Sequence, residues 1–406
     1  MNRHIGVPQM AGLLQTFCKY TVLGAAAFAF SVSATTQPKK LLVFDYKLDA
    51  SWVASHGREY VFVWGASTGA TLKTFAEHAP QTVLSKYFPY SRDANAKHGI
   101  GFWKKFHADW IQYECDGRTP ATMYGGGNIS LDINNPKVRQ WQLGNFLKLP
   151  NDVHEVALDN YQFNTRSHAC GHMEARGFIK RYTGEQDDRI FAEDVVSWLE
   201  EIANGLHAKN IRLIVNHTPD LAPNGDDPSS PLVQRMVASV DGILDEGAAK
   251  ALSSGEYAAT LARLVTYATG HGKRFYFVYR LRQFDDHTVE TAIANYLTMA
   301  SPLTAVYVNS LSDTYGSEPP NFLGYDRPIG EPCGPTIFQG EVALRKYSQG
   351  MVAYMPTGGV ATEVPISRGY LDLHGLSAGT SLRLSAGQGR VLYRSQSFGC
   401  GRGEVR

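Results

Sequence analysis

The run His154-Glu155-Val156-Ala157-Leu158-Asp159 indicates the fold class, because it is a short apolar strand that ends in a carboxylate. Residues 212–217 (RLIVNH) and 240–246 (VDGILDE) have the same form, with polar groups where the strand ends. Between such strands the sequence places apolar residues at helical spacing, as in 193–208. This alternation of strand and helix is typical of α/β proteins built on a parallel sheet.

The alternation continues on both sides of these three strands. Further strands are expected at 60–66, 82–87, 110–115, 274–281 and 304–309, which makes eight, and 41–46 is an extra strand or replaces the first. Helices are expected at 136–146, capped by Asn135, and at 193–208, 256–269 and 289–300. Eight strands with helical crossovers predict a closed (β/α)₈ TIM barrel, whose typical length is about 250 residues. An open doubly wound sheet is the alternative.

The two ends of the chain do not show the alternation of strand and helix that predicts the barrel. After Cys333, short alternating runs separated by Gly and Pro extend to Tyr393 and predict a small antiparallel β-sandwich domain. Residues 1–34 contain two basic and no acidic residues, then a short apolar stretch that ends at Ala34. We therefore expect a signal peptide at 1–34, a barrel at 35–332 and a C-terminal β-domain at 333–406, with an uncleaved anchor as the alternative at the start.

Export would place the cysteines in an oxidising compartment, and we expect the protein to be secreted or periplasmic. Removal of 1–34 leaves Cys115, Cys170, Cys333 and Cys400. Four cysteines allow three connectivities. Cys115 and Cys170 follow neighbouring predicted strands, which favours a disulfide between them, but the sequence does not choose among the three.

The composition excludes several classes of protein. With 39 basic and 38 acidic residues the formal net charge is +1, and no basic run indicates a nucleic-acid partner. Apolar residues make up 43% of the chain, which excludes disorder as its main state. No Gly-x-Gly-x-x-Gly follows a strand, so we expect no cofactor. The spacing in His168-Ala169-Cys170-Gly171-His172 is not one of the usual zinc spacings, so we expect no metal.

Carboxylates collect where the predicted strands end, which is where barrels of this kind place their active sites. Asp159 follows one strand, and Asp245 and Glu246 follow another. Adjacent residues on a strand point to opposite faces, so only one of Asp245 and Glu246 faces the cleft. Two carboxylates on separate strands suit glycoside hydrolysis, in which one protonates the leaving oxygen and the other attacks the anomeric carbon or activates water. We assign Asp159 as nucleophile or base and Glu246 as acid, with Asp245 as its substitute.

Polar and aromatic residues near the same strand ends are candidates for binding a sugar, because an aromatic ring offers an apolar face and often a polar edge. The candidate substrate-binding residues are Trp64, Lys86, Tyr87, Glu114, Tyr161, Asn216 and Arg280. Lys86 and Arg280 lie within strands, and charges that face into a barrel need partners, which we expect the acidic rim to supply.

Several segments together resemble one family. They are Lys86-Tyr87, Ser91-Arg92-Asp93, 107–113 (HADWIQY), 131–139 (LDINNPKVR), 157–160 (ALDN) and 240–246, followed by 347–353, 370–375 and 389–393. They span residues 40 to 395 and resemble uncharacterised bacterial glycosyl hydrolases, distantly like the polygalactosaminidase-type barrels. The resemblance implies a (β/α)₈ barrel with a β-domain behind it, and Asp159 with the Asp245/Glu246 pair as catalytic positions.

The resulting hypothesis is a secreted glycoside hydrolase that acts on a polysaccharide or oligosaccharide, with no membrane association in the mature form. A carbohydrate-binding protein on a barrel scaffold without a working carboxylate pair is the alternative. A metal-dependent hydrolase that uses the histidines at 168 and 172 is a third possibility.

Overall fold

The computed structural model describes residues 39–90, 99–123, 128–219, 227–320, 327–394 and 400. The expected signal peptide at 1–34 lies outside these ranges. Within them, no helix combines the length and the apolar character needed to cross a membrane.

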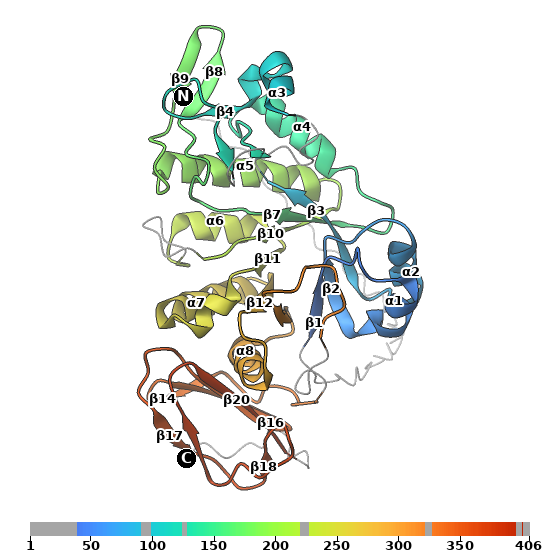
Figure 1. Ribbon diagram of the computed structural model, residues 1–406, viewed down its shortest axis with the longest axis vertical. Helices are drawn as coiled ribbons and strands as arrows, with labels where there is room; N and C mark the ends of the chain where they lie inside the picture. The colour runs from blue at the N-terminus through green and yellow to red at the C-terminus, as the bar shows by residue number, and fades with distance from the viewer. Residues whose placement is uncertain are drawn as a thin grey trace, which may run out of the picture. The chain divides into compact units, whose positions relative to one another are not determined.

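Eight parallel strands close into a barrel, which confirms the predicted fold class (Figure 1). Around the barrel the strand order is β1-β13-β12-β11-β10-β7-β3-β2. The strands are β1 (Lys40–Val43), β2 (Tyr60–Trp64), β3 (Val83–Pro89), β7 (Glu155–Asp159), β10 (Arg212–Asn216), β11 (Gly242–Asp245), β12 (Arg274–Leu281) and β13 (Thr304–Ser310). The ring closes where β1 pairs with both β2 and β13.

One predicted barrel strand is wrong. The run 110–115 contributes only β4 (Gln112–Tyr113), which pairs antiparallel with β8 (Gly171–Glu174) and not with any barrel strand. The eighth strand of the ring is instead β1, which lies between β2 and β13 and comes from the run that the sequence left as an extra or replacement strand, while β3 pairs directly with β7. The alternating pattern of 110–115 is real, but periodicity does not say which sheet a strand joins.

Helices follow most barrel strands and cover them. They are α1 (Ala50–His56), α2 (Ala70–His78), α3 (Ile100–Phe106), α4 (Pro136–Phe146), α5 (Arg189–His207), α6 (Pro231–Ser239), α7 (Gly255–Gly270) and α8 (Asp286–Met299). Asn135 caps α4 by accepting a hydrogen bond from the Lys137 amide, and Pro136 occupies the first helical position as predicted. Helix α8 begins with a capping box between Asp285 and Thr288.

Side chains alternate between the inside of the barrel and the helices. Ala157, Ile214 and Leu244 belong to the cluster inside the barrel, whereas Leu158 and Val215 pack outward against helices. With a period of two, the residue two positions beyond an inward one also faces inward. The alternation therefore directs the last side chains of β7 and β10, and the first residue after β11, toward the mouth of the barrel.

Two long connections form a small module beside the barrel mouth. The connection after β3 supplies β4, and the connection after β7 supplies β8 and β9 (Gly177–Lys180), which together make a three-stranded sheet. A disulfide joins Cys115 to Cys170 across these connections.

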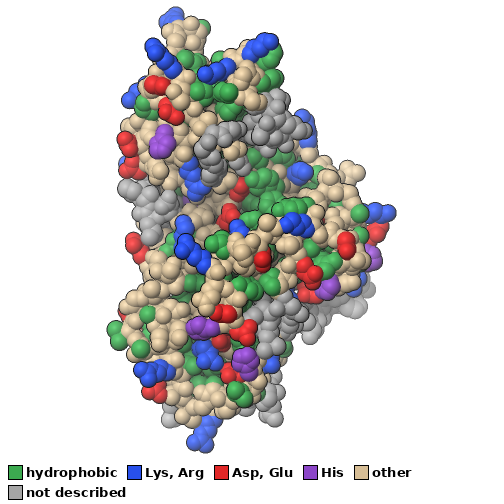
Figure 2. All heavy atoms as spheres, in the orientation of Figure 1, with side chains coloured by type: hydrophobic (Ala, Val, Ile, Leu, Met, Phe, Trp, Pro, Cys, Tyr) green, Lys and Arg blue, Asp and Glu red, His purple; other side chains and the backbone are tan. Residues whose placement is uncertain are grey.

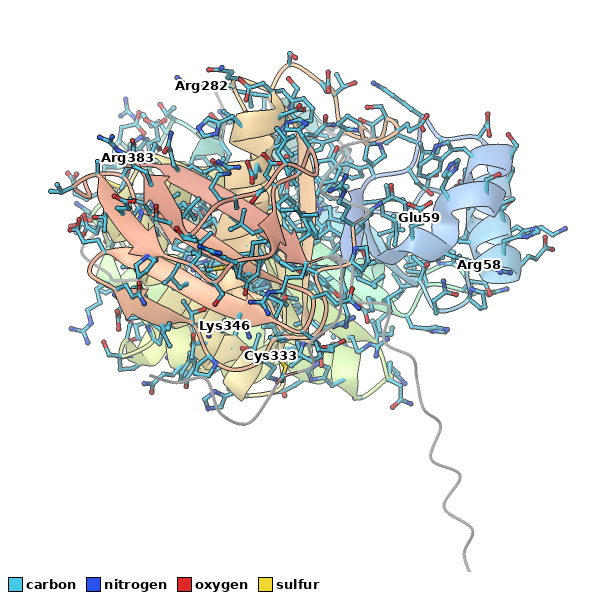
Figure 3. All side chains as sticks on the ribbon, turned by 90° about the horizontal axis from the view of Figure 1, so that it is seen from below. Arg58, Glu59, Arg282, Cys333, Lys346 and Arg383 are labelled. Atoms are coloured by element: carbon cyan, nitrogen blue, oxygen red, sulfur yellow. A yellow bond between two sulfur atoms is a disulfide. The ribbon has the colours of Figure 1, made fainter. Side chains whose placement is uncertain are left out.

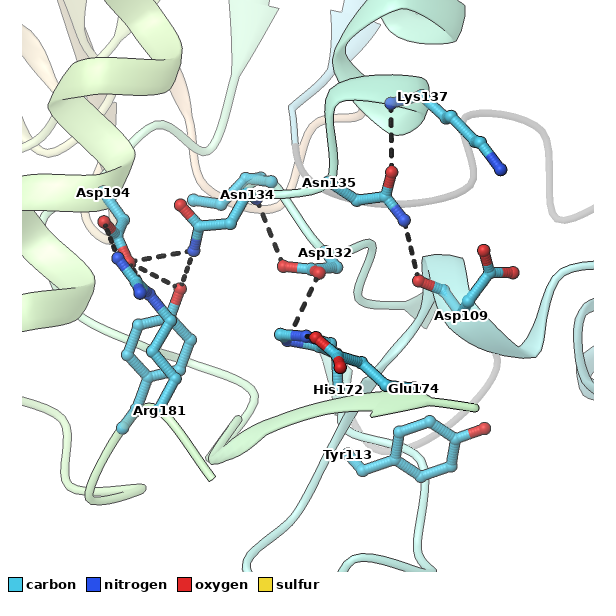
Figure 4. A network of polar contacts seen from close by, with 12 residues as sticks. Asp109, Tyr113, Asp132, Asn134, Asn135, Lys137, His172, Glu174, Arg181 and Asp194 are labelled. Carbon is cyan, nitrogen blue, oxygen red and sulfur yellow. Dashed lines mark hydrogen bonds and ion pairs between the residues drawn. The ribbon is translucent and has the colours of Figure 1, made fainter. Parts of the chain in front are cut away.

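A polar network adds to this link between the connections (Figure 4). Asp132 lies 3.5 Å from His172, and Arg181 donates to Asp194, which also accepts from Asn134 at 2.9 Å. Burial raises the pKa of Asp132, while the neighbouring charge of His172 opposes the rise.

The last part of the chain is antiparallel, as predicted (red in Figure 1). A five-stranded sheet has the order β14-β15-β16-β20-β18, and β17 pairs with β19. The strands are β14 (Ile337–Gln339), β15 (Val342–Tyr347), β16 (Gly350–Met355), β17 (Thr362–Pro365), β18 (Tyr370–Leu371), β19 (Ser381–Leu384) and β20 (Gln388–Arg394). A second disulfide joins Cys333 to Cys400, and the Cys333 amide donates to the carbonyl of nearby Lys346 (Figure 3). Tyrosines of this sheet hydrogen-bond barrel helices, as Tyr347 does to the Leu297 carbonyl at 2.6 Å.

At the amino ends of the barrel strands, a buried carboxylate lies between two arginines. Glu155, which is fully buried at the start of β7, lies 2.5 Å from Arg212 Nε and 2.8 Å from Arg274 Nη2. Burial raises the pKa of Glu155, and the charge of Arg274 lowers it. Removing one member of such a cluster leaves uncompensated buried charge, which destabilises more than the cluster itself stabilises.

Glu155→Ala should therefore lower the free energy of unfolding by about 3–5 kcal/mol, measured by denaturant unfolding. The matched control is Glu77→Ala, because Glu77 makes an exposed i,i+4 pair with Lys73 and its loss should cost less than about 1 kcal/mol. Equal effects of the two substitutions would contradict the role given to the cluster.

Candidate active site at the mouth of the barrel

Asp159 and Glu246 meet at the carboxyl ends of the strands through one amide. The Asn216 Nδ2 atom donates to Asp159 Oδ1 at 2.7 Å and to Glu246 Oε2 at 3.0 Å. Asn216 is 5% exposed, so its amide lies below the two carboxylates and fixes their spacing. Three predicted site residues from three adjacent strands are thus brought together.

Each carboxylate also accepts a hydrogen bond from a tyrosine. Tyr87 donates to Asp159 Oδ2 at 2.8 Å, and Tyr315 donates to Glu246 Oε1 at 2.6 Å. Burial and the charge of Glu246 raise the pKa of Tyr315, so its hydroxyl keeps the proton that it donates. The Arg280 guanidinium lies 4.4 Å from the Tyr315 ring centre and helps to hold that ring.

The backbone is unusual directly after two of the strands. Asn160 has φ 60° and donates from its side chain to Asp159 Oδ2 at 2.5 Å. Asn tolerates this left-handed conformation better than most residues. Phe44, which follows β1, has φ 62° and packs so closely on Gly65 that a Cβ there would lie 2.5 Å from the Phe44 ring. Such conformations are costly and persist where the surrounding packing imposes them.

The Asp245 side chain points toward helix α7 and not toward the barrel mouth. It is fully buried and accepts hydrogen bonds from the Tyr257 hydroxyl of α7, at 3.0 and 2.9 Å, and from the Gly247 amide at 2.7 Å. Burial raises its pKa to about 6. Glu246, one residue on, is exposed at the mouth. The structure therefore separates the pair, and Asp245 does not lie with Asp159.

Three of the expected sugar-binding residues lie elsewhere. Trp64 is 2% exposed in the barrel interior, and Tyr161 is fully buried against Phe163 and the ring of His217. Both belong to the core, because apolar packing decides the place of most buried aromatics. Glu114 follows β4 in the inserted module, since 110–115 is not a barrel strand.

The two cations do not have the acidic partners that we expected. Arg280 Nη2 donates to the carbonyls of Leu311 and Asp313, at 2.8 and 2.6 Å. Lys86 lies on the opposite face of β3 from Tyr87, so it does not point into the barrel. Among the described residues, neither cation forms an ion pair with a carboxylate.

Sequence reasoning missed Tyr315 and Asn160. Asn160 directly follows the strand-end carboxylate, and that position was the available signal. Tyr315 lies in the connection after β13, and no local pattern relates it to Glu246, which is 69 residues away.

A Gly-x-Ser-x-Gly segment, Gly65–Gly69, joins β2 to α2. The Ser67 amide donates to Asp45 Oδ1 at 2.6 Å, and Ser67 Oγ lies 3.1 Å from Thr71 Oγ1. In the part of the chain that the structure describes, no histidine hydrogen-bonds Ser67, so the serine–histidine pairing of a nucleophile elbow is not formed there.

The side chains of the run 168–172, considered above as possible metal ligands, contact protein groups instead. His168 Nδ1 lies 3.2 Å from the Gly184 carbonyl, Cys170 is in a disulfide, and His172 lies beside Asp132 and Glu174. Within the described ranges, no group of three or more His, Cys, Asp or Glu side chains is arranged to hold a metal ion.

Comparison with known proteins gives only distant similarities. No family model and no curated protein matches the chain. The maltogenic α-amylase AmyB from Thermotoga neapolitana is 11% identical, with 89% of this chain and 97% of that chain covered and a TM-score of 0.49. An α-amylase from Malbranchea cinnamomea is 10% identical, with 89% and 98% covered and a TM-score of 0.48. A GH31 dextranase from Flavobacterium johnsoniae is 12% identical, with 89% and 52% covered and a TM-score of 0.46. No residue role is transferred from proteins this distant.

The raised pKa of Asp245 predicts how stability depends on pH. The folded state favours protonated Asp245, so this residue contributes to the free energy of unfolding while it is protonated. The contribution is complete below pH 3.8, the ordinary pKa of the group, and is lost as the pH rises through about 6. Asn cannot ionise, so Asp245→Asn should gain about 2–3 kcal/mol relative to the parent between pH 3.5 and pH 8. Denaturant unfolding at several pH values measures the difference.

Asp116→Asn is the control for this series. Hydrogen bonds from Thr119 lower the pKa of Asp116 to about 2 in the folded state, whereas the unfolded state keeps the ordinary value of 3.8, so Asp116 affects the pH dependence of stability only below about pH 5. Between pH 5 and pH 8 the difference between Asp116→Asn and the parent should stay constant. A constant difference for Asp245→Asn as well would show that Asp245 is not the group responsible.

Proposed function

We propose that this protein hydrolyses glycosidic bonds of a polysaccharide or oligosaccharide, with Asp159 and Glu246 as the catalytic pair. The observation that carries the proposal is the shared hydrogen bonding of both carboxylates to Asn216. They come from separate strands and lie at the carboxyl ends of those strands. On the face of the molecule drawn in Figure 2, hydrophobic, acidic and basic side chains are intermixed. A pair of this kind is what glycoside hydrolysis requires.

The environments of the two groups support different roles. Asp159 is half-buried and accepts from Tyr87, Asn160 and Asn216, which stabilise its negative charge and suit a nucleophile. Glu246 faces solvent at the mouth, and we assign to it the protonation of the leaving oxygen because Asp159 takes the role of nucleophile. The Asp159 carboxylate attacks the anomeric carbon as the glycosidic C–O bond breaks and Glu246 delivers its proton. Water, deprotonated by Glu246, then releases the sugar and restores both groups.

The spacing supports retention of configuration. Two oxygens that share one amide nitrogen lie under about 6 Å apart, close to the retaining range of about 5–5.5 Å and short of the inverting range. We assign a double displacement on this basis, with Asn216 as the residue that positions both carboxylates.

The proposed setting is extracellular or periplasmic. The two disulfides are consistent with an oxidising compartment, and a signal peptide at 1–34 is part of the proposal. The barrel at 35–332 would carry the site, and the β-domain at 333–406 would hold no catalytic group.

Isosteric amides test the catalytic pair. Asp159→Asn should lower kcat/KM by about 10⁴ or more, and Glu246→Gln by about 10²–10⁴, in reducing-sugar assays on a panel of glycans. The matched control is Glu201→Gln, because Glu201 is exposed on α5 and pairs with Arg139. Unchanged turnover in either of the first two variants would remove that residue from the mechanism.

The stereochemical outcome tests the spacing. The sugar first released should have the same anomeric configuration as the bond that was cut, as followed by proton NMR before mutarotation. Release of the opposite anomer would mean that a water lies between the two groups and that Asp159 acts as a base.

A carbohydrate-binding protein without turnover is the second candidate, and one observation favours it. Both oxygens of Glu246 accept hydrogen bonds from protein donors, Asn216 and Tyr315, so a proton donor role requires one of them to yield. Glycan binding by the parent without release of reducing sugar on the same panel would support this candidate.

A further inference from the structure

A row of aromatic side chains lies on the inserted module, on α3, the 3₁₀ helix η2 (Ala108–Trp110) and α4. The centres of successive rings lie 5.1, 5.9, 4.3 and 6.1 Å apart along the row, whose members in order are Phe106, Phe102, His107, Trp110 and Trp141. Phe106 is 58% exposed, and the other four are partly exposed. The helices α3 and α4 lie at the end of the molecule away from the C-terminal sheet (Figure 1), and the proposed mechanism uses none of these residues.

Packing beneath the aromatic row supports it. Trp103 is 2% exposed, and its ring centre lies 5.6–6.4 Å from those of four members, Phe102, His107, Trp110 and Trp141. The Asn135 side chain joins η2 to α4, since it donates to the Asp109 carbonyl at 2.9 Å and accepts from the Lys137 amide at 3.0 Å (Figure 4). Rings placed in this way lose little conformational freedom when a ligand binds.

The edges of these rings offer unused hydrogen-bonding groups. Within the described part of the chain, the indole N–H groups of Trp110 and Trp141 donate to no acceptor, and the His107 ring forms no hydrogen bond. An aromatic face with a free polar edge suits a pyranose, whose C–H groups pack on the face while its hydroxyls reach the edge. A purely apolar partner would bury these nitrogens without hydrogen bonds, which is unfavourable.

Positive charge lies at both ends of the aromatic row. Lys105 Nζ is 4.9 Å from the centre of the Phe106 ring, and Lys137 precedes Trp141 by four residues, which places both on one face of α4. Neither lysine forms an ion pair with a described residue. The segments α3, η2 and α4 contain three lysines and one carboxylate, that of Asp109. Charge complementarity therefore favours an anionic ligand.

We propose that the aromatic row binds an acidic polysaccharide, whose sugar rings stack on the aromatic faces and whose carboxylate or sulfate groups pair with Lys105 and Lys137. The choice of a glycan over another anionic polymer rests on the proposed function, but this binding requires no turnover. The module would thus hold the polymer through residues other than Asp159 and Glu246.

The test measures binding of the full-length protein by affinity electrophoresis and titration calorimetry. The probes are two acidic glycans, polygalacturonate and dextran sulfate, with dextran, poly-L-glutamate and single-stranded DNA as comparisons. At least one acidic glycan should bind about tenfold or more tightly than dextran, which lacks charge, and than poly-L-glutamate, which lacks sugar rings. The preference over dextran should weaken as salt is raised, because ion pairs are screened. The two acidic glycans distinguish carboxylate from sulfate recognition.

Aromatic variants assign the binding to the row. Trp110→Ala and Trp141→Ala should each weaken binding of the acidic glycan about tenfold or more. Phe106→Ser should weaken it in the same direction, and the exposure of Phe106 makes this variant the one least able to disturb the fold. Trp52→Ala is the matched control and should leave binding unchanged, because Trp52 is a partly exposed ring stacked on His56, with ring centres 4.9 Å apart.

Lysine variants test the charge. The double variant Lys105→Met/Lys137→Met should remove most of the preference for the acidic glycan over dextran, whereas Lys73→Met should not, because Lys73 lies 78% exposed on α2. Four results would each overturn the proposal: no binding of either acidic glycan, equal binding of dextran, tighter binding of poly-L-glutamate or single-stranded DNA, or unchanged affinity in the aromatic variants.

Reducing-sugar release from the same glycans separates this proposal from the proposed function. Binding that depends on the aromatic row, without release, would support the row and reject the hydrolase. Release from a glycan whose binding is unaffected by the aromatic variants would do the reverse.

Discussion

The structure depends on the two-residue alternation of side chains in a closed ring of strands. Because the ring has an inside and an outside, each strand residue either fills the barrel or packs against a helix. Ala157 and Leu244 fill the interior, which directs Asp159 and Glu246 to the mouth. The same alternation sends Asp245 to Tyr257 on α7. A shift of one residue in β11 would exchange the two carboxylates and remove the site.

The mouth places negative groups close together and surrounds them with donors. Two carboxylates this close repel each other, and the Asn216 amide between them offsets part of that repulsion. Tyr87, Asn160 and Tyr315 supply further donors. Each of these three donors is a neutral amide or hydroxyl group.

Much of this arrangement could be predicted from the sequence. The apolar run before Asp159 and the cap at Asn135 are local signals, and both the strand and the helix form as predicted. The strand period predicts that only one of Asp245 and Glu246 faces the mouth, and the contact of Asp245 with Tyr257 shows which one does not. The prediction that failed depends on a distant partner, because 110–115 looks like a barrel strand until its pairing with β8 is known. The burial of Trp64 and Tyr161 likewise depends on tertiary packing, which the sequence pattern does not contain. Tyr315 reaches Glu246 across the barrel, a relation that no periodicity contains.

The inserted module makes one side of the rim of the mouth more rigid than the other side. On one side, the connections after β3 and β7 are cross-linked by the Cys115–Cys170 disulfide and share a sheet, so they can shift only together. On the other side, the segment around Tyr315 is held by noncovalent contacts, which include the hydrogen bond to Glu246 and the backbone hydrogen bonds of Gly316 with Val43 and Lys47. Noncovalent contacts open at lower cost than a covalent cross-link. Movement of the rim would therefore cost less on the Tyr315 side, and it would break the hydrogen bond from Tyr315 to Glu246.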